Sequence, residues 1–516
     1  MNSKRAQEKS SQVDKIIKSI NDRQKTQEPS TSLEQNMSII QGLFADVDIL
    51  RTKLIQNSRY PELRYGIAFC DGVVSGAIIN DNILRPLMIS EAAQPGPQLM
   101  DLLSKQVVQI GEAAWTEDFS KIIEAICYGD TVLFAEGIAK AMILNTKGFT
   151  TRATTEPENE RSLSGPREGF TESIMQNLSF IRRKMRTNDL KMKFLSLGKQ
   201  SNTSICVCYI GSIANQAVLK EVYRRLNQID IDAVLDSNYI TELIRDKHWA
   251  LFRSTGYTER PDVVVGKLLE GRVAIFIDGT PSVLTVPYLF IENFQSNEDY
   301  YLNFYYTTYS RLLRIIGFFL TVGVPGIYIA VVAFHHEMLP TALLINIAAE
   351  QQSVPLPAVL EAFIMLVVFD ILRETGIRMP SNIGQALGIV GALVIGQAAV
   401  EAKMVSSPMI IVVGITGITN LLVPKLNAPV IYFRFFVLLS ASVFGFLGFV
   451  LSTSCLMIHI FNLTSMGIPQ TTLGGDMKHQ QIKDTAIRAP WWQMLQRPPI
   501  LTQNLTRLRQ KGDDNA

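Results

Sequence analysis

The residues with the clearest chemical potential lie in an apolar stretch, 315–372, that contains no lysine or arginine. Its ionisable side chains are acids and histidines: Glu337, Glu350, Glu361, Asp370, His335 and His336. The stretch is long enough to enter a bilayer twice, because a helix needs about 20 apolar residues to cross. A carboxylate at membrane depth is costly unless it faces protein or water. We therefore expect a membrane domain with a cation path to begin here.

Helical spacing decides which of these polar side chains can act together. Asn346 and Glu350 are four residues apart and share a helix face, which predicts a polar pore or mouth. Glu361 and Asp370 lie on opposite sides of one helix, about 180° apart. Asp370 is close to Arg373, which favours a local ion pair. The ion-pathway candidates are therefore Asn346, Glu350 and Glu361, and for Glu361 an internal hydrogen bond is an equally good interpretation.

Enzyme, metal and nucleic-acid functions find little support in the sequence. It has no P-loop and no Gly-x-Ser-x-Gly motif, and His335-His336-Glu337 lacks the second histidine of a zinc-protease helix. The five cysteines show no repeated spacing, so neither a disulfide framework nor a zinc site is indicated, and no cofactor is expected. A formal net charge of +2 leaves no basic footprint for nucleic acid.

The composition indicates a soluble half joined to a membrane half, because the mean hydropathy is +0.16 although 19% of the residues are charged. About five apolar segments follow residue 311, at 312–334, 356–372, 383–400, 409–423 and 431–461. The last is long enough to tilt or to break near Gly445 and Gly448. The stretch 341–351 is too short to span and predicts an amphipathic or re-entrant helix.

Charge sets part of the topology. Arg311 and Arg314 place the entry of the first span inside, and Arg373 and Arg378 follow the second, so an in-out-in path fits. The N-terminus lacks a secretory signal, so we expect the soluble half to be cytoplasmic. Five full spans would put the C-terminal tail outside and an even number would keep it inside. Its basic residues favour the inside.

The soluble half alternates strand and helix signals, which predicts an α/β region. The pattern Gly-x4-Phe-x-acid-Gly occurs at 129–137 and again at 271–279, displaced by 142 residues (271 minus 129). Two similar lobes are expected, although strands that end in glycine also match by chance. The expected parts are a flexible polar tail (1–36), a first lobe (37–149), a linker and helix (150–189), a second lobe (190–310), the membrane domain (311–465) and a polar C-terminal tail (466–516).

A set of separated motifs in the soluble half and the tail matches one known pattern. The motifs are Gly165-Pro166-Arg167-Glu168-Gly169-Phe170, Glu259-Arg260-Pro261-Asp262, Gly271-Arg272, Asp278-Gly279-Thr280-Pro281, Glu298-Asp299-Tyr300-Tyr301 and Arg488-Ala489-Pro490-Trp491. Together they resemble the A subunit of bacterial spore germination receptors, the GerA family, over about residues 60–505. The resemblance implies that some residues of these motifs have a role in assembly or are signature residues of the family: Arg167, Glu168, Arg260, Asp262, Arg272, Asp278, Pro281 and Asp299.

The resemblance implies a multi-pass protein of the spore inner membrane with a cytoplasmic N-terminal domain. In that family the partners are a transporter-like B subunit and a lipoprotein C subunit. The A subunits form a homo-oligomer in the lipid bilayer that conducts monovalent cations when a nutrient is sensed. Nutrient recognition is attributed mainly to the B subunit, so the resemblance does not require a nutrient pocket in the lobes.

Three other functions stay open at this point. A secondary transporter subunit would use the same acids for a coupling ion, but transporters usually show paired repeats in the membrane region, and none is evident here. A SpoVA-associated F-type paralogue would share the fold and amplify germination without its own nutrient. A structural scaffold would leave the acids without a purpose. The acids without bases favour a cation channel subunit, and the resemblance implies that a nutrient gates it.

Overall fold

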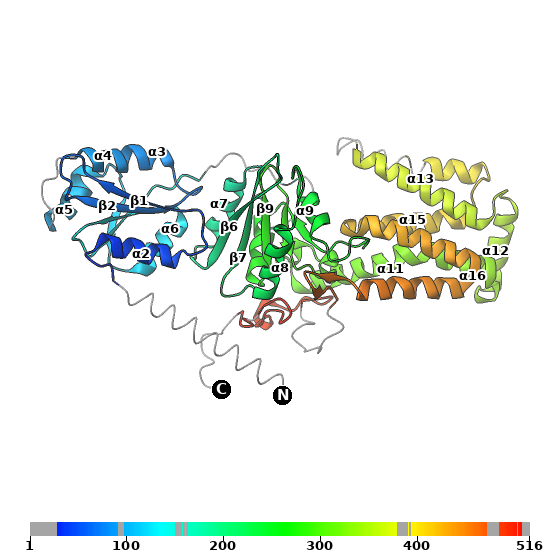
Figure 1. Ribbon diagram of the computed structural model, residues 1–516. Helices are drawn as coiled ribbons and strands as arrows, with labels where there is room; N and C mark the ends of the chain where they lie inside the picture. The colour runs from blue at the N-terminus through cyan, green and yellow to red at the C-terminus, as the bar shows by residue number, and fades with distance from the viewer. Residues whose placement is uncertain are drawn as a thin grey trace, which may run out of the picture.

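The computed structural model describes residues 28–90, 97–149, 157, 160, 164–378, 391, 394–471, 484–502 and 504–507. Along the molecule lie a first sheet, a second sheet and a helical bundle (Figure 1). Most of the expected polar tail, and parts of the expected linker, of the segment 383–400 and of the C-terminal tail, lie outside the described residues. Helix α2 (Leu33–Leu43) begins within the expected tail, because Ser32 caps it and Leu33 and Asn36 are buried.

The first lobe contains a five-stranded sheet in which every pair of neighbouring strands is antiparallel. In spatial order its strands are β1 (Leu50–Gln56), β2 (Arg64–Cys70), β4 (Thr131–Ala135), β5 (Ala141–Leu144) and β3 (Ala113–Thr116). Its other helices are α3 (Gly76–Ile78), α4 (Arg85–Ile89), α5 (Pro97–Leu102) and α6 (Phe119–Tyr128). Apolar side chains of α2 and α6 pack on one face of the sheet, and those of α4 and α5 pack in a second cluster on the other.

The second lobe repeats this strand order. Its strands are β6 (Leu190–Leu197), β7 (Thr203–Ile210), β9 (Val273–Ile277), β10 (Val283–Val286) and β8 (Gly256–Thr258), again antiparallel. Its helices are α7 (Ile174–Lys184), α8 (Gln216–Leu226), α9 (Ser237–Leu243) and α10 (Pro261–Leu269). One apolar cluster includes residues of α2, α6, α7 and α10, so the two lobes are packed together through α7.

The repeated sequence pattern occupies equivalent places in the two sheets. Gly129 and Gly271 follow α6 and α10 with φ of 98° and 95°. Gly137 and Gly279 follow β4 and β9 with φ of 80° and 88°. A side chain is disfavoured at such positive φ, which explains why glycine stands at both ends of the pattern. The two occurrences of the pattern therefore have the same conformation in the two lobes.

The C-terminal half is a bundle of helices. They are α11 (Phe304–Phe334), α12 (Thr341–Gln352), α13 (Ala358–Arg378), α15 (Ser407–Leu421) and α16 (Asn427–Phe461). Within the described residues, two helices are long and apolar enough to cross a membrane, Phe304–Phe334 and Pro424–Phe461, and α15 is a shorter apolar helix. Helix α12 has 12 residues and is too short to cross, as the sequence predicts.

Helix α16 is folded back on itself. Phe433 and His459 are 26 residues apart (459 minus 433), which would separate them by about 39 Å on a straight helix. Their ring centroids are 5.8 Å apart. The chain reverses at Gly445, whose φ of 61° and ψ of −137° are not helical. The break expected near Gly445 is confirmed, and it separates two antiparallel arms, 427–444 and 446–461.

Both ends of the bundle lie against the second lobe (Figure 1). At the start of α11, Thr307 Oγ1 donates to the Asp299 carbonyl at 3.1 Å. Directly after α16, the Asn462 carbonyl accepts a hydrogen bond from Lys247 Nζ at 2.8 Å. Further along, Thr502 forms a bridge with Ala214 in the second lobe. The bundle therefore leaves and rejoins the α/β region at the same end.

Candidate functional site: a charged joint and the carboxylates of the bundle

A buried charge network lies where the second lobe leads into the bundle. Its centre is Arg272, whose side chain is 3% exposed and follows the tight turn before β9. Arg272 Nη1 pairs with Glu292 and donates to the Pro287 carbonyl at 2.7 Å, and its Nη2 lies 3.3 Å from Glu270 Oε2. Lys267 Nζ lies 2.5 Å from Glu292 Oε2. Burial opposes ionisation of Glu292, but the charges of Arg272 and Lys267 outweigh it and lower its pKa to about 2.

A second network holds the base of α11. Arg311 is fully buried, with its Nε 2.7 Å from Asp299 Oδ2 and its Nη1 2.9 Å from Asp484 Oδ1. Arg314 reaches Asp299 Oδ1 at 3.0 Å. The Tyr300 hydroxyl donates to Asp484 Oδ2 at 2.9 Å, and burial raises the pKa of Asp484 in spite of the Arg311 charge. The start of α11 is thus bound both to the turn before it and to the returning C-terminal segment.

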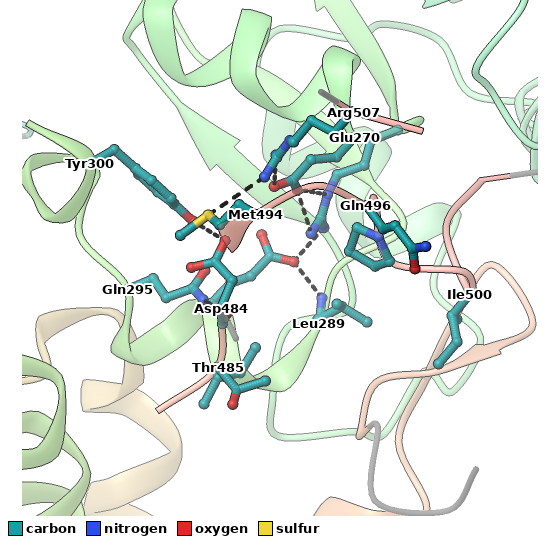
Figure 2. A pocket seen from close by; sticks show the side chains of 14 residues that line it. Glu270, Leu289, Gln295, Tyr300, Asp484, Thr485, Met494, Gln496, Ile500 and Arg507 are labelled. Carbon is teal, nitrogen blue, oxygen red and sulfur yellow. Dashed lines mark hydrogen bonds and ion pairs between the residues drawn. The ribbon is translucent and has the colours of Figure 1, made fainter. Parts of the chain in front are cut away.

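A small cavity lies between these networks, as Figure 2 shows. Its volume is about 60 Å³. Its wall includes Glu270, Arg272, Tyr300 and Asp484, together with Arg507, which pairs with Glu270 at 3.1 Å. Pockets for small organic ligands measure about 300–1,000 Å³. The cavity is smaller than such pockets and has room for a few water molecules only. The networks around Arg272 and Arg311, which connect the second lobe to α11, are called the charged joint below.

Arg260 and Asp262 attach a third segment to the charged joint. Arg260 Nη2 lies 3.0 Å from Asp262 Oδ2 and donates to the Pro166 carbonyl at 2.7 Å. Asp262 Oδ2 also accepts from the Tyr301 hydroxyl at 2.7 Å and from Asn297 Nδ2 at 2.6 Å. Burial acts to raise the pKa of Asp262, but its hydrogen bonds and the Arg260 charge bring it below its usual range. Three of the sequence motifs therefore meet in space.

The remaining signature residues lie around α7. Glu168 pairs with the last residue of α7 at 2.9 Å. Asp278 Oδ1 accepts from the first backbone N–H of α7 at 3.1 Å and so caps its N-terminus. Pro281 lies in the turn between β9 and β10, and Arg167 is exposed. Glu168 and Asp278 therefore hold the two ends of the helix that packs between the lobes.

Two carboxylates of the bundle meet the start of α15. Glu361, 1% exposed on α13, accepts from the Ser406 N–H at 2.5 Å and from its hydroxyl at 2.6 Å. Glu350, exposed on α12, lies 3.3 Å from the Ser407 hydroxyl. The exposed N–H groups of a helix N-terminus favour an acid there. The internal hydrogen bond considered for Glu361 is present, whereas Asn346 is exposed on α12.

The ion pair of Asp370 corrects an expectation from the sequence, because its partner is Arg434 and not Arg373. Arg434 lies fully buried on the first arm of α16, and its Nη2 donates to Asp370 Oδ2. A buried guanidinium has no water to solvate it, so a nearby carboxylate is its strongest partner. Within the described chain, Nε and Nη1 of Arg434 and Oδ1 of Asp370 have no hydrogen-bond partner.

A groove of about 400 Å³ runs beside Asp370. It is lined by Val367, Asp370, Ile371, Glu374, Thr375 and Ile431. Asp370 and Glu374 are four residues apart and so share the face of α13 that borders the groove. Glu361 lies on the other side of this helix, buried against α15. Helix α13 therefore has two separate acidic positions.

Comparison with known proteins identifies the family. A family model described as "Bacillus/Clostridium GerA spore germination protein" matches residues 38–500, which is most of the chain. The chain belongs to the GerA family of spore germination proteins. The resemblance seen in the sequence motifs is therefore confirmed.

Relatives of this GerA-family protein cover most of its length. Spore germination protein KA of Bacillus subtilis (strain 168) is 39% identical over 491 residues, covering 94% of this chain and 89% of the relative. An uncharacterized membrane protein, YfkQ, of the same strain is 40% identical over 434 residues, covering 84% of each chain. The crystal structure of the N-terminal domain of the A subunit of the Bacillus megaterium spore germinant receptor GerK3 is 31% identical, with a TM-score of 0.42, covering 51% of this chain and 97% of that domain.

Only some residues of the charged joint and of the Asp370 ion pair carry a signal in the sequence. Arg272 and Asp299 were singled out by motif. Arg311 entered only as a topology signal, and Asp484 and Arg434 were overlooked. A signal was available for Arg434, since an arginine in a segment as apolar as 431–461 is costly and therefore points to function. Nothing in the spacing indicates Asp484, because its partners are far away in sequence.

Proposed function

We propose that this GerA-family protein is a subunit of a nutrient-gated cation channel in the spore inner membrane. Several copies form a ring in which the helical bundles surround the cation path. A transporter-like B subunit senses the nutrient, and a lipoprotein C subunit completes the receptor. Relatives named spore germination proteins KA and A1 support the role in germination.

The acidic groove of α13 carries this proposal. Asp370 and Glu374 border a groove of about 400 Å³ whose other lining residues are Val367, Ile371, Thr375 and Ile431. Rings of carboxylates are a common way to select cations in channels. In the proposed ring, the groove faces the neighbouring copy and Arg434 neutralises Asp370 in the closed state. Separation of this pair then opens an acidic path.

The charged joint supplies a route from the lobes to the path. Arg311 and Arg314 belong to α11, and their acidic partners belong to the turn before it and to the C-terminal segment. A buried ion pair that loses one partner costs about 3–5 kcal/mol. A movement of the second lobe therefore cannot leave the base of α11 in place. In this proposal the partner subunit moves the lobes, and α11 transmits that movement to the bundle.

The ends of the bundle support a multi-pass topology with an even number of crossings. Both ends lie against the second lobe, so the lobes and the C-terminal segment are on one side. Arg311 and Arg314 at the start of α11 favour the cytoplasm for that side. The arms 427–444 and 446–461 then count as two crossings. A cytoplasmic C-terminal tail is therefore favoured over the five-span alternative.

Nutrient-triggered ion release tests the proposal. The receptor is reconstituted with its B and C subunits in potassium-loaded vesicles, and potassium release is recorded after nutrient addition. We expect Arg434→Gln to release potassium without nutrient, because Asp370 loses its countercharge, and Asp370→Asn to lower the release several-fold. Glu337→Gln, in the loop after α11, is the matched control and should behave as wild type. Saturable flux coupled to another solute would contradict a channel.

Glu350 and Glu361 have a test of their own. Glu350→Gln or Glu361→Gln should alter cation release while the amount and assembly of the protein stay unchanged. The change is expected because each acid meets a serine at the start of α15, where a cation can replace the hydrogen bond. Unchanged release in both variants removes these acids from the path.

A further inference from the structure

The loop 245–253 of the second lobe is attached to the end of the bundle nearest the lobes. Phe252 is 1% exposed, stacks on Phe433 with ring centroids 5.7 Å apart, and lies 5.7 Å from the His459 ring. Lys247 Nζ donates to the Asn462 carbonyl at 2.8 Å. The loop therefore contacts both arms of α16, at a fixed height on the bundle.

The length of the second arm of α16 gives the distance of the loop from the turn at Gly445. Asn462 is 17 residues after Gly445 (462 minus 445), which corresponds to about 26 Å of helix. The hydrocarbon core of a bilayer is about 30 Å thick. With the Gly445 turn at the far face of the membrane, Lys247 lies at the level of the near headgroups. This placement rests on the proposed membrane-spanning role of the bundle.

The exposed side chains of the loop have the chemistry of a membrane interface. Trp249 is 96% exposed and Leu251 is 42% exposed. Lys247 and Arg253 are also exposed, as is the histidine between Lys247 and Trp249. No acid occurs from residue 247 to residue 258. Tryptophan is enriched at the headgroup level, and bases close to a cytoplasmic leaflet are attracted to its anionic lipids.

The acid at the start of this loop, Asp246, already has partners within the protein. Asp246 pairs with Arg225. Its carboxylate also accepts the N–H groups of Met466 at 3.0 Å and Gly467 at 2.9 Å. Its charge is therefore directed into the protein. The outer surface of the loop keeps an excess of positive charge beside an exposed indole.

We propose that residues 247–253 form a bilayer anchor that binds anionic phospholipid headgroups. Trp249 lies among the headgroups and the first carbons of the acyl chains, and Lys247 and Arg253 contact lipid phosphates. The anchor holds this loop at the membrane surface beside α16, so that a movement of the second lobe pivots about the loop and displaces the base of α11. A protein partner or a second copy on this loop would exclude lipid from Trp249.

Quenching of tryptophan fluorescence by brominated lipids tests the anchor. Full-length protein is reconstituted in vesicles of phosphatidylcholine brominated at acyl carbons 6 and 7, and the Trp249 signal is the difference between wild type and Trp249→Phe. Trp492→Phe, which removes an exposed tryptophan of the C-terminal segment, is the control. We expect at least about half of the Trp249 signal to be quenched, as for an interfacial indole, and much less of the Trp492 signal. A Trp249 signal that lipid bromine does not quench overturns the anchor, whether water or protein surrounds the indole.

The headgroup preference is tested with the same vesicles. Energy transfer from Trp249 to a dansyl-labelled lipid is compared for phosphatidylglycerol and phosphatidylcholine. We expect about a two-fold or larger preference for the anionic lipid, which Arg253→Gln reduces. Equal transfer to both lipids overturns the anionic binding. Flotation of the vesicles with the protein is scored separately, so a protein that fails to insert at all counts against the membrane-spanning bundle and not against the loop.

Discussion

The two lobes share a fold but differ in the residues that follow one shared turn. In the first lobe Gly129 precedes Asp130, whose buried carboxylate pairs with the half-buried Lys147 at 2.8 Å. In the second lobe Gly271 precedes Arg272, which is buried between two glutamates at the charged joint. The backbone has the same conformation in both places, and the side chains have opposite charge and different partners.

The difference between the lobes indicates which parts of the repeat serve folding and which serve function. Glycines with positive φ and apolar strand residues occur at equivalent places in both lobes, since both sheets need the same turns and cores. The polar residues differ, and in the part of the chain that the structure describes the bundle is attached to the second lobe through Asp299 and Lys247. The first lobe, farther from the bundle in Figure 1, has a local ion pair where the second has a network that reaches α11.

The largest difference between the two lobes is expected in the loss of stability when the residue after the shared glycine is replaced by alanine. Arg272→Ala leaves Glu292 and Glu270 buried without their main countercharge, so we expect the free energy of unfolding to fall by about 3–5 kcal/mol. Asp130→Ala removes a single pair with Lys147 whose carboxylate is already disfavoured by burial, and should cost at most about 1 kcal/mol. Thermal unfolding of the purified variants measures both effects. Equal losses would show that the two positions are energetically equivalent after all.

The pH dependence of stability should also differ between the lobes. Glu292 has its pKa lowered to about 2, so its ionised form stabilises the fold by about 3 kcal/mol at neutral pH. That contribution is complete above about pH 4.5 and is lost as the pH falls from there towards 2. Burial raises the pKa of Asp130, so its ionised form opposes folding at neutral pH.

The sign of this difference can be measured with two conservative variants. Glu292→Gln should be much less stable than wild type at pH 7, and the difference should shrink as the pH approaches 2. Asp130→Asn should be neutral or slightly stabilising at pH 7, because it removes a charge that burial disfavours. A Glu292→Gln deficit that is the same at pH 7 and pH 3 is the result this explanation does not allow.

The smallest expected difference concerns the acids that end the repeated pattern. Asp278→Ala removes the cap of α7 and should lower the free energy of unfolding by about 1 kcal/mol. Glu136→Ala removes only an ion pair with Arg64 and should cost less than about 0.5 kcal/mol. Chemical unfolding curves with matched slopes resolve such changes. A larger loss for Glu136→Ala than for Asp278→Ala would contradict the role of Asp278 as the cap of α7.

Local sequence patterns predicted much of the backbone. The glycine pattern at 129–137 and 271–279 indicated the repeat, since positive φ constrains residue type directly. The glycine at 445 likewise indicated a break. That the arms of α16 turn back on each other was not predictable, because this depends on packing between side chains such as Phe433 and His459.

The charged contacts were less accessible to sequence reasoning. Helical spacing put Asp370 near Arg373, but the structure pairs it with Arg434, which is 64 residues away. Spacing along one helix gives local neighbours only, whereas a buried charge pairs across helices. The role of Asp370, Glu350 and Glu361 in ion conduction stays a prediction.

Electrical recording from the reconstituted receptor tests the channel proposal most directly. With nutrient present, we predict discrete openings that each pass many monovalent cations, and a several-fold smaller conductance for Asp370→Asn than for wild type. Glu337→Gln should leave the conductance unchanged. A wild-type receptor that responds to nutrient without any such openings would contradict the proposal that this GerA-family subunit forms a cation channel.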